Sequence, residues 1–189
     1  MKIGIDMDNT LTNTLPVLTK YCILYNEEVV KRNLTLNSKG YNPPTLFDWT
    51  EEEILGFSKQ YLEKACWEAT VKQDAKEVLE TLQKQGHSLY FITARRKPYF
   101  ADPTLFTKNY LEKHQIPYDK IIAECPSKAA YCVQEGIDVM IDDEIPNVTS
   151  VAKYIPVLCM QAKHNEWLQG NNIIPVKDWI AVKAYFEKR

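Results

Sequence analysis

The stretch Lys2-Ile-Gly-Ile-Asp-Met-Asp-Asn-Thr-Leu-Thr12 decides the fold of this 189-residue chain. In it, Ile3 and Ile5 alternate with a small residue and a charged one, a period of two that predicts a short, buried β-strand. Asp6 and Asp8 lie at the carboxyl end of this strand. Because aspartate is disfavoured in strands, two aspartates here indicate a chemical role rather than a structural one.

Helical and extended patterns alternate from residue 74 onward. Each strand pattern is a short apolar run, and each helical pattern repeats apolar residues every three or four positions. The predicted strands span 88–93, 120–123, 139–141, 156–159 and 173–174, and the predicted helices span 75–86, 103–115, 128–134, 146–152 and 177–188. Such alternation implies βαβ crossovers and therefore an α/β fold, a Rossmann-like parallel sheet flanked by helices.

Polar residues occupy the carboxyl ends of three of these strands. Asp6 follows the first strand, and Thr93 ends the strand over 88–93. Asp142 and Asp143 follow the strand over 139–141. In open parallel sheets, ligands bind outside the carboxyl ends of the strands. We therefore expect these side chains to meet at one edge of the sheet.

No strand pattern occurs in the segment between the first strand and residue 87. Thr50 and Glu53 form a capping-box sequence, which predicts a helix start. The predicted helices of this segment span 16–32 and 51–64, with irregular chain over the Pro- and Asn-containing residues 33–49. A mostly helical insertion is therefore expected directly after the first strand.

The acids that the topology would bring together are Asp6, Asp8, Asp142 and Asp143. Four carboxylates in one crevice repel each other, and some of them take up protons unless a cation binds. All of these ligands offer hard oxygen atoms, and the pattern adds no His or Cys to them, which favours Mg²⁺ over zinc or copper. Mg²⁺ readily accepts a phosphate oxygen as a ligand, so the sequence favours a phosphate substrate.

These motifs together resemble a known superfamily. The sequence D-x-D-x-T after an N-terminal strand, followed in order by Thr93, Lys128 and Asp142-Asp143, is similar to the motifs of the haloacid dehalogenase-like phosphohydrolases. The resemblance spans nearly the whole chain and is strongest to the 5'(3')-deoxyribonucleotidase-like branch. It implies a small helical cap over residues 14–71, inserted into a core domain made of residues 1–13 and 72–189.

The resemblance also implies catalytic roles. Asp6 would be the nucleophile that forms an aspartyl-phosphate, and Asp8 would protonate the leaving group and then activate water. Thr93 would hydrogen-bond the phosphoryl oxygens, and Lys128 would offset the negative charge. For Mg²⁺, the implied ligands are the Asp6 carboxylate, the Asp8 carbonyl and the pair Asp142 and Asp143, with the order of direct and indirect ligation within that pair left open.

Substrate-binding candidates lie near these motifs. They are Asn9, Thr10, Ala94, Arg95, Phe47 and Trp49. Backbone N–H groups after Asp8 would bind phosphate, although Thr10 is expected mainly to brace the loop. Arg95 would hold a second anionic group or lie solvated. Phe47 and Trp49 would stack on a base, or else form the cap's own core, which is the favoured reading for either residue.

Composition and charge indicate which partners and which cellular compartment to expect. The net charge is −2 and the pI about 6.0, which gives no reason to expect a nucleic acid polymer or an anionic membrane as partner. No apolar run reaches the ~20 residues of a membrane span, and the five cysteines form no CxxC pair. We therefore expect a cytoplasmic protein with reduced thiols. The histidines His87, His114 and His164 lack metal or catalytic spacing and are expected at the surface or at edges.

The predicted function is that of a Mg²⁺-dependent phosphatase acting on a small phosphate monoester, with a nucleoside monophosphate as the leading substrate. One alternative is a phosphotransferase that uses the same Asp6. Another is a non-catalytic phosphate-binding or receiver-like protein, although in receiver domains the acidic pair comes first and the phosphorylated aspartate later. The sequence leaves the oligomeric state open.

Overall fold

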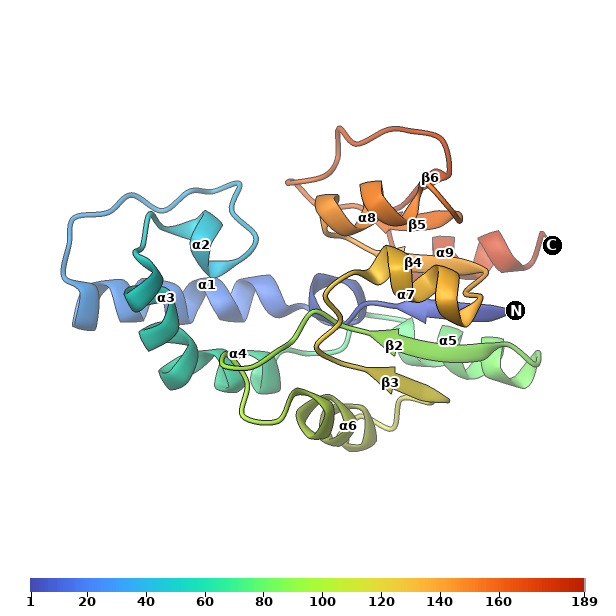
Figure 1. The fold of residues 1–189 in the computed structure, drawn as a ribbon, viewed down its shortest axis with the longest axis horizontal. Coiled ribbons are helices and arrows are strands. Elements are labelled where there is room, and N and C mark those ends of the chain that lie inside the picture. Colours follow the sequence, from blue (N-terminus) through green and yellow to red (C-terminus); the bar gives the residue numbers. More distant parts are fainter. Residues whose placement is uncertain (189) are drawn as a thin grey trace.

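The computed structural model describes residues 1–188, and within them six strands form one parallel sheet in the order β3-β2-β1-β4-β5-β6 (Figure 1). The strands are β1 Lys2–Ile5, β2 Ser88–Ile92, β3 Lys120–Ile122, β4 Val139–Asp142, β5 Val157–Met160 and β6 Ile173–Val176. The α/β fold expected from the sequence is therefore confirmed. Residue 189, the end of the expected core domain, lies outside the described residues.

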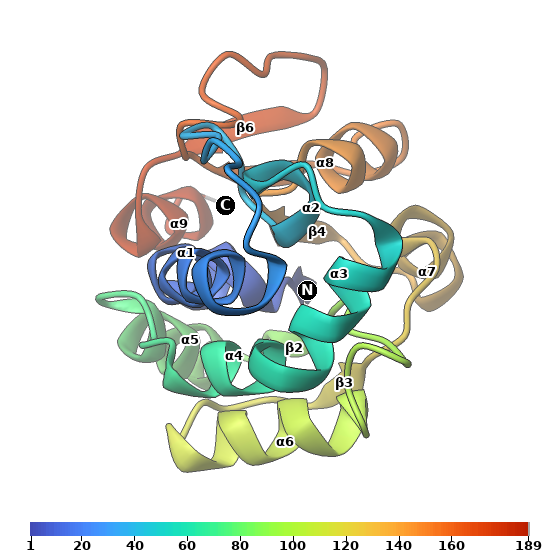
Figure 2. The same cartoon turned by 90° about the vertical axis from the view of Figure 1, so that its left-hand side faces the viewer.

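Helices cover both faces of the sheet. They are α5 Ala75–Lys84, α6 Pro103–Lys113, α7 Lys128–Glu135, α8 Ile145–Val151 and α9 Trp179–Phe186. One apolar core joins α5, α6 and α9 to one face, and a second joins α7 and α8 to the other. Figure 2 shows α5 and α9 on one side of the sheet and α7 and α8 on the other.

The central strands are buried on both faces because their side chains alternate between these two cores. Ile141 of β4 packs in the core under α5 and α9, and its neighbour Met140 packs in the core under α7 and α8. Two-sided burial is typical of parallel sheets and explains why these strands read as short continuous apolar runs.

The segment after β1 is helical, as expected, and forms a separate layer beyond the carboxyl end of the sheet (Figure 1). Its helices are α1 Thr14–Tyr25, α2 Pro43–Leu46, α3 Glu51–Phe57 and α4 Glu63–Glu68, and wide helical turns extend α1 over Asn26–Val30 and join α3 to α4 over Ser58–Leu62. These helices pack around an apolar cluster of their own, which includes Leu18, Tyr25 and Phe57.

The two chain crossings between sheet and insertion lie side by side. Their contacts are the antiparallel bridge Thr12–Val71 and the hydrogen bonds from Asn13 N to Thr70 O (2.8 Å) and from Lys72 N to Leu11 O (2.8 Å). The insertion thus leaves and re-enters the core at a single point.

Local capping signals fix most helix starts. The reciprocal Thr50–Glu53 capping box is present, and the side chains of Asp102 and Ser127 accept N–H groups at the starts of α6 and α7. One expectation was wrong, since residues 33–49 are not wholly irregular. The two prolines that read as breakers occupy the first turn of α2, where their missing N–H groups cost nothing, and Asn42 caps that turn.

Candidate active site

The sheet order places the acids as expected. Because β1 pairs with β4 in parallel, their carboxyl ends lie together, and the Asp6 N–H donates to the Ile141 carbonyl at 2.9 Å. The chain then turns sharply over Met7–Leu11, where Asn9 takes a left-handed φ of 61°. This conformation, tolerated by asparagine, directs the loop back across the end of the sheet.

Three carboxylates form a buried cluster at this edge. Asp6, Asp142 and Asp143 each contribute an oxygen, and these oxygens lie within 4.8 Å of one another. The buried Lys128 donates to Asp6 Oδ1 at 2.5 Å and to Asp142 Oδ2 at 2.7 Å. Burial raises the pKa of Asp6 well above its ordinary value, against the lowering effect of Lys128 and with added repulsion from the other acids.

This arrangement fits a divalent cation. Burial also raises the pKa of Asp143, against the lowering effect of its contacts with His164 and Thr10. The ammonium of Lys128 contacts two of the three carboxylates, and the His164 imidazole contacts the third, so three carboxylates share one lysine and one histidine. Closely spaced carboxylate oxygens with unbalanced charge suit a hard cation such as Mg²⁺. The Asp8 carboxylate is not part of this cluster.

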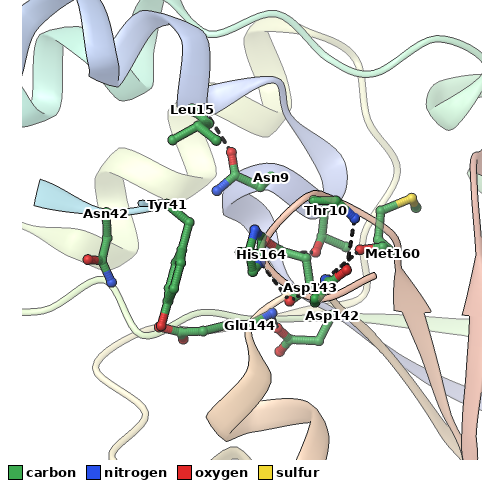
Figure 3. Close-up of polar contacts among 12 residues, drawn as sticks. Asn9, Thr10, Leu15, Tyr41, Asn42, Asp142, Asp143, Glu144, Met160 and His164 are labelled. Carbon is green, nitrogen blue, oxygen red and sulfur yellow. Dashed lines mark hydrogen bonds and ion pairs between the residues drawn. The ribbon is translucent and has the colours of Figure 1, made fainter. Parts of the chain in front are cut away.

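Asp143 is held from two sides (Figure 3). The Thr10 hydroxyl donates to its Oδ1 at 3.0 Å, and His164 Nε2 lies 3.3 Å from its Oδ2 and 3.0 Å from its backbone oxygen. The Asn165 amide donates to the same backbone oxygen at 2.7 Å. Burial alone would lower the pKa of His164, but its hydrogen bonds to Asp143 outweigh that effect and raise it.

His164 therefore corrects the sequence analysis. It is 7% exposed and contacts an acid of the cluster, whereas we expected a surface or edge residue. The chain between β5 and β6 returns over the end of β4, and this return brings His164 to Asp143. The spacing of the histidines gave no hint of this, but the position of His164 just after the carboxyl end of β5 did.

Asp8 is paired with Arg95. The guanidinium donates to Asp8 from Nε at 2.8 Å and from Nη2 at 2.7 Å, and the Thr14 hydroxyl adds a bond of 2.9 Å. Burial tends to raise the pKa of Asp8, but the charge and hydrogen bonds of Arg95 outweigh it and lower the pKa. The contacts with Arg95 therefore favour the ionised form of Asp8.

Arg95 is buried rather than solvated. It is 4% exposed, and its guanidinium lies 5.5 Å from the ring centre of Phe100 and 5.2 Å from that of Phe106. The sequence analysis assigned it to a second anionic group of the substrate or to solvent, and the structure pairs it with Asp8. The exposed Arg96 beside it lines the same cavity.

A cavity of about 450 Å³ lies between this edge and the insertion. Among the expected site residues, its lining includes Asp6, Asp8, Asn9, Thr93, Ala94, Arg95 and Asp143. The insertion contributes a second wall, which includes Tyr41, Ile54 and Leu62. A volume of this size suits a small metabolite.

Some expected site residues do not line the cavity. Lys128 and Asp142 lie behind Asp6 and Asp143, which do line the cavity, and Lys128 bonds to both Asp6 and Asp142. Thr10 is fully buried, its hydroxyl bound to Asp143 and its carbonyl accepting from Trp179 Nε1 at 3.1 Å. These contacts agree with the favoured role of Thr10 in bracing the loop, and the residue does not line the cavity.

Phe47 and Trp49 lie in the core of the insertion, which was the favoured of the two readings for them. They stack on each other at 5.3 Å inside the insertion, and Trp49 Nε1 donates to Asn26 Oδ1 at 3.1 Å. Both are buried in the apolar cluster of the insertion and neither lines the cavity. The aromatic residues that do line it are Tyr41, Tyr99 and Phe100, which the sequence analysis did not single out.

Two known proteins are similar to this chain over most of their length. YqfW of Bacillus subtilis, described as a candidate nucleotidase, is 28% identical over 186 residues, which cover 95% of this chain and 90% of the relative. A nucleotidase of Clostridium acetobutylicum is 26% identical over 190 residues, which cover 100% of this chain and 94% of the relative. No protein-family model matches the chain.

The solved structure of a haloacid dehalogenase-like hydrolase from Streptococcus pneumoniae superposes on 98% of this chain and 97% of its own, with a TM-score of 0.71 and 16% identity. The chain has the haloacid dehalogenase-like fold. The fold agrees with the expected resemblance to haloacid dehalogenase-like phosphohydrolases, and the names of the two relatives agree with the expected phosphatase class. Among the helices of residues 1–188, none is both long enough and apolar enough to cross a membrane.

Proposed function

We propose that this haloacid dehalogenase-like protein is a Mg²⁺-dependent phosphomonoester hydrolase that works through an aspartyl-phosphate on Asp6. The observation that carries the proposal is the meeting of Asp6, Asp143 and Lys128 at one sheet edge, beside a cavity that Asp8 and Thr93 also line. Phosphoryl transfer depends mainly on positioning and on stabilising charge at the phosphoryl oxygens, and this edge supplies groups for both.

In the first half-reaction, an oxygen of Asp6 attacks phosphorus, and the bond between phosphorus and the ester oxygen breaks. Lys128, bound to Asp6 Oδ1 at 2.5 Å, orients the nucleophile and offsets its charge. Thr93, at the end of β2, and the backbone N–H groups of the loop after Asp8 would hold the phosphoryl oxygens.

Asp8 serves both half-reactions by holding and moving a proton. In the second one, its carboxylate accepts a proton from the water that attacks the aspartyl-phosphate, which suits the ionised state favoured by Arg95. In the first one, it delivers a proton to the leaving oxygen, so the ion pair with Arg95 has to weaken when Asp8 is protonated.

The carboxylates of Asp6, Asp142 and Asp143 would hold Mg²⁺, together with the backbone carbonyl of Asp8. When bound, Mg²⁺ supplies positive charge that stabilises the phosphoryl oxygens. The raised pKa values of Asp6 and Asp143 in the metal-free protein are consistent with a site whose charge is incomplete without a cation.

We further propose residues 14–71 as a cap on a core of residues 1–13 and 72–189. The cap supplies one wall of the cavity, which favours small substrates over phosphorylated proteins. A nucleoside monophosphate is the leading candidate because both relatives found by sequence are named for nucleotidase activity.

The test is phosphate release from an aryl phosphate by purified protein with and without Mg²⁺. Wild type should turn over only with the metal, and Asp6→Asn should abolish turnover, while the exposed control Asp48→Asn should not. Equal turnover by Asp6→Asn and wild type would refute the proposal. Transfer of the phosphoryl group to an added alcohol instead of water would favour a phosphotransferase, and binding of phosphate without turnover would favour a non-catalytic protein. Nucleoside monophosphates and sugar phosphates would then be compared by kcat/KM.

A further inference from the structure

We propose that Tyr41 and His164 form a latch between cap and core that positions Asp143, so that the covered state of the cavity binds a divalent cation more tightly. Tyr41 lies in the insertion and His164 in the chain between β5 and β6, yet their rings stack at 4.5 Å with an interplanar angle of 26°. This inference rests on the metal site of the proposed function and adds a route by which the cap acts on that site.

The core side of the latch is the support of Asp143. His164 Nε2 and the Asn165 amide both face the Asp143 backbone oxygen, at 3.0 and 2.7 Å, and His164 Nε2 also lies 3.3 Å from the carboxylate (Figure 3). Asn165 is in turn fixed to the end of β5 by its bond to Met160 O at 2.9 Å. Residues that orient a metal-binding side chain in this way typically contribute about 10- to 100-fold in metal affinity.

The cap side of the latch is a loop with a fixed shape. Tyr41 N donates to Thr45 Oγ1 at 2.9 Å, and Gly40 packs directly on the backbone of the same residue. A Cβ atom at Gly40 would lie only 2.5 Å from Thr45 O, so the close approach requires glycine. The Tyr41 ring is therefore carried by α2 and its preceding turn rather than by a freely moving loop.

Tyr41 also connects the latch to the substrate space. Its ring lies against His164, and the residue lines the cavity beside Asn42. Figure 3 shows its hydroxyl end pointing toward Glu144, which directly follows Asp142 and Asp143 in the chain. A cap that moves away removes the ring from His164, and by reciprocity a cation held by Asp143 favours the covered state.

The test measures Mn²⁺ binding to the full chain by calorimetry and by electron paramagnetic resonance, without substrate. We expect His164→Phe, which keeps a ring for stacking but lacks Nε2, to weaken binding by about 10- to 100-fold. Tyr41→Ala should weaken it severalfold, and Tyr41→Phe should bind as wild type does. The double variant Tyr41→Ala/His164→Phe should be no weaker than His164→Phe alone, because the effect of Tyr41 passes through His164.

The matched control is Tyr99→Ala, which removes another aromatic residue of the cavity that has no stacking contact with His164. It should leave Mn²⁺ affinity unchanged while altering KM for substrate. Wild-type affinity in Tyr41→Ala, or additive losses in the double variant, would overturn the latch and leave the proposed function intact. Absence of Mn²⁺ binding by wild type would overturn the metal site and the latch together. Thermal unfolding of each variant separates loss of fold from loss of binding.

Discussion

Replacing Lys128 by methionine should destabilise the metal-free protein strongly. The Lys128 ammonium is buried and bridges Asp6 at 2.5 Å and Asp142 at 2.7 Å, so its removal leaves two buried carboxylates without this counter-charge. Breaking a buried ion pair by deleting one partner costs about 3–5 kcal/mol in the free energy of unfolding. For a chain of this size each kcal/mol lowers Tm by about 2–4 °C, so the expected loss is about 6–20 °C.

The assay is thermal unfolding in a chelator-containing buffer and again with saturating Mg²⁺. Added cation should restore much of the lost Tm in Lys128→Met, because it supplies charge to the same carboxylates. The matched control is Lys120→Met, which breaks the Lys120–Glu135 pair of 2.8 Å at the surface and should leave Tm nearly unchanged. A Tm within about 2 °C of wild type for metal-free Lys128→Met would refute the charge argument.

Three further outcomes are expected. Calorimetry should find that Asp143→Asn weakens Mg²⁺ binding more than about tenfold, while Asp8→Asn changes it little. Of these two residues, Asp143 contributes its carboxylate to the acidic cluster and Asp8 does not, so equal losses of affinity would contradict the proposed metal site. Asp6 and Asp143 have raised pKa values in the folded protein, so their contribution to stability is full below about pH 4 and is lost as the pH rises through those values. The gain in Tm on adding Mg²⁺ should therefore grow with pH. A gain in Tm that does not change with pH would contradict the raised pKa values of Asp6 and Asp143. Trp49→Ala should lower the free energy of unfolding by about 3–5 kcal/mol in denaturant unfolding and leave KM for a nucleotide nearly unchanged, because Trp49 packs in the core of the insertion. A large rise in KM with no loss of stability would instead indicate that Trp49 stacks on the base.

Much of the fold could be predicted because its signals are local. The alternation of Ile3 and Ile5 marks a strand by itself, and the caps at Thr50, Asp102 and Ser127 mark helix starts within four residues of chain. The alternation of strands and helices implies a parallel sheet. In a parallel sheet the carboxyl ends of the strands lie at one edge, so the position of the site can be predicted as well. Four acids were expected to meet there without any knowledge of side-chain packing. Asp6, Asp142 and Asp143 do so, whereas the Asp8 carboxylate pairs with Arg95 instead.

The remaining features depend on contacts between distant parts of the chain. The contact of Tyr41 with His164 joins segments more than a hundred residues apart, and neither residue carries a local signal for it. Arg95 begins the basic run Arg95-Arg96-Lys97, and nothing in that run indicates that the fold brings it to Asp8. The sequence left two readings of Trp49, stacking on a base or packing in the core of the insertion, and only the packing of the insertion places it in that core.

The paired crossings at Thr12 and Val71 have a consequence for how such a protein can change. The two chains cross as neighbours, tied by the hydrogen bonds around that bridge, so the segment between them can be exchanged for another of different length with its ends held the same distance apart. Such a graft would leave the sheet and the carboxylates of Asp6, Asp142 and Asp143 in place. It would replace the cavity wall that the insertion contributes, together with the contacts of Thr14 with Asp8 and of Tyr41 with His164. A library of grafted segments on this base would vary the cavity wall while the sheet stays the same, and the cation affinity of each graft would report how much the acidic cluster depends on the segment above it.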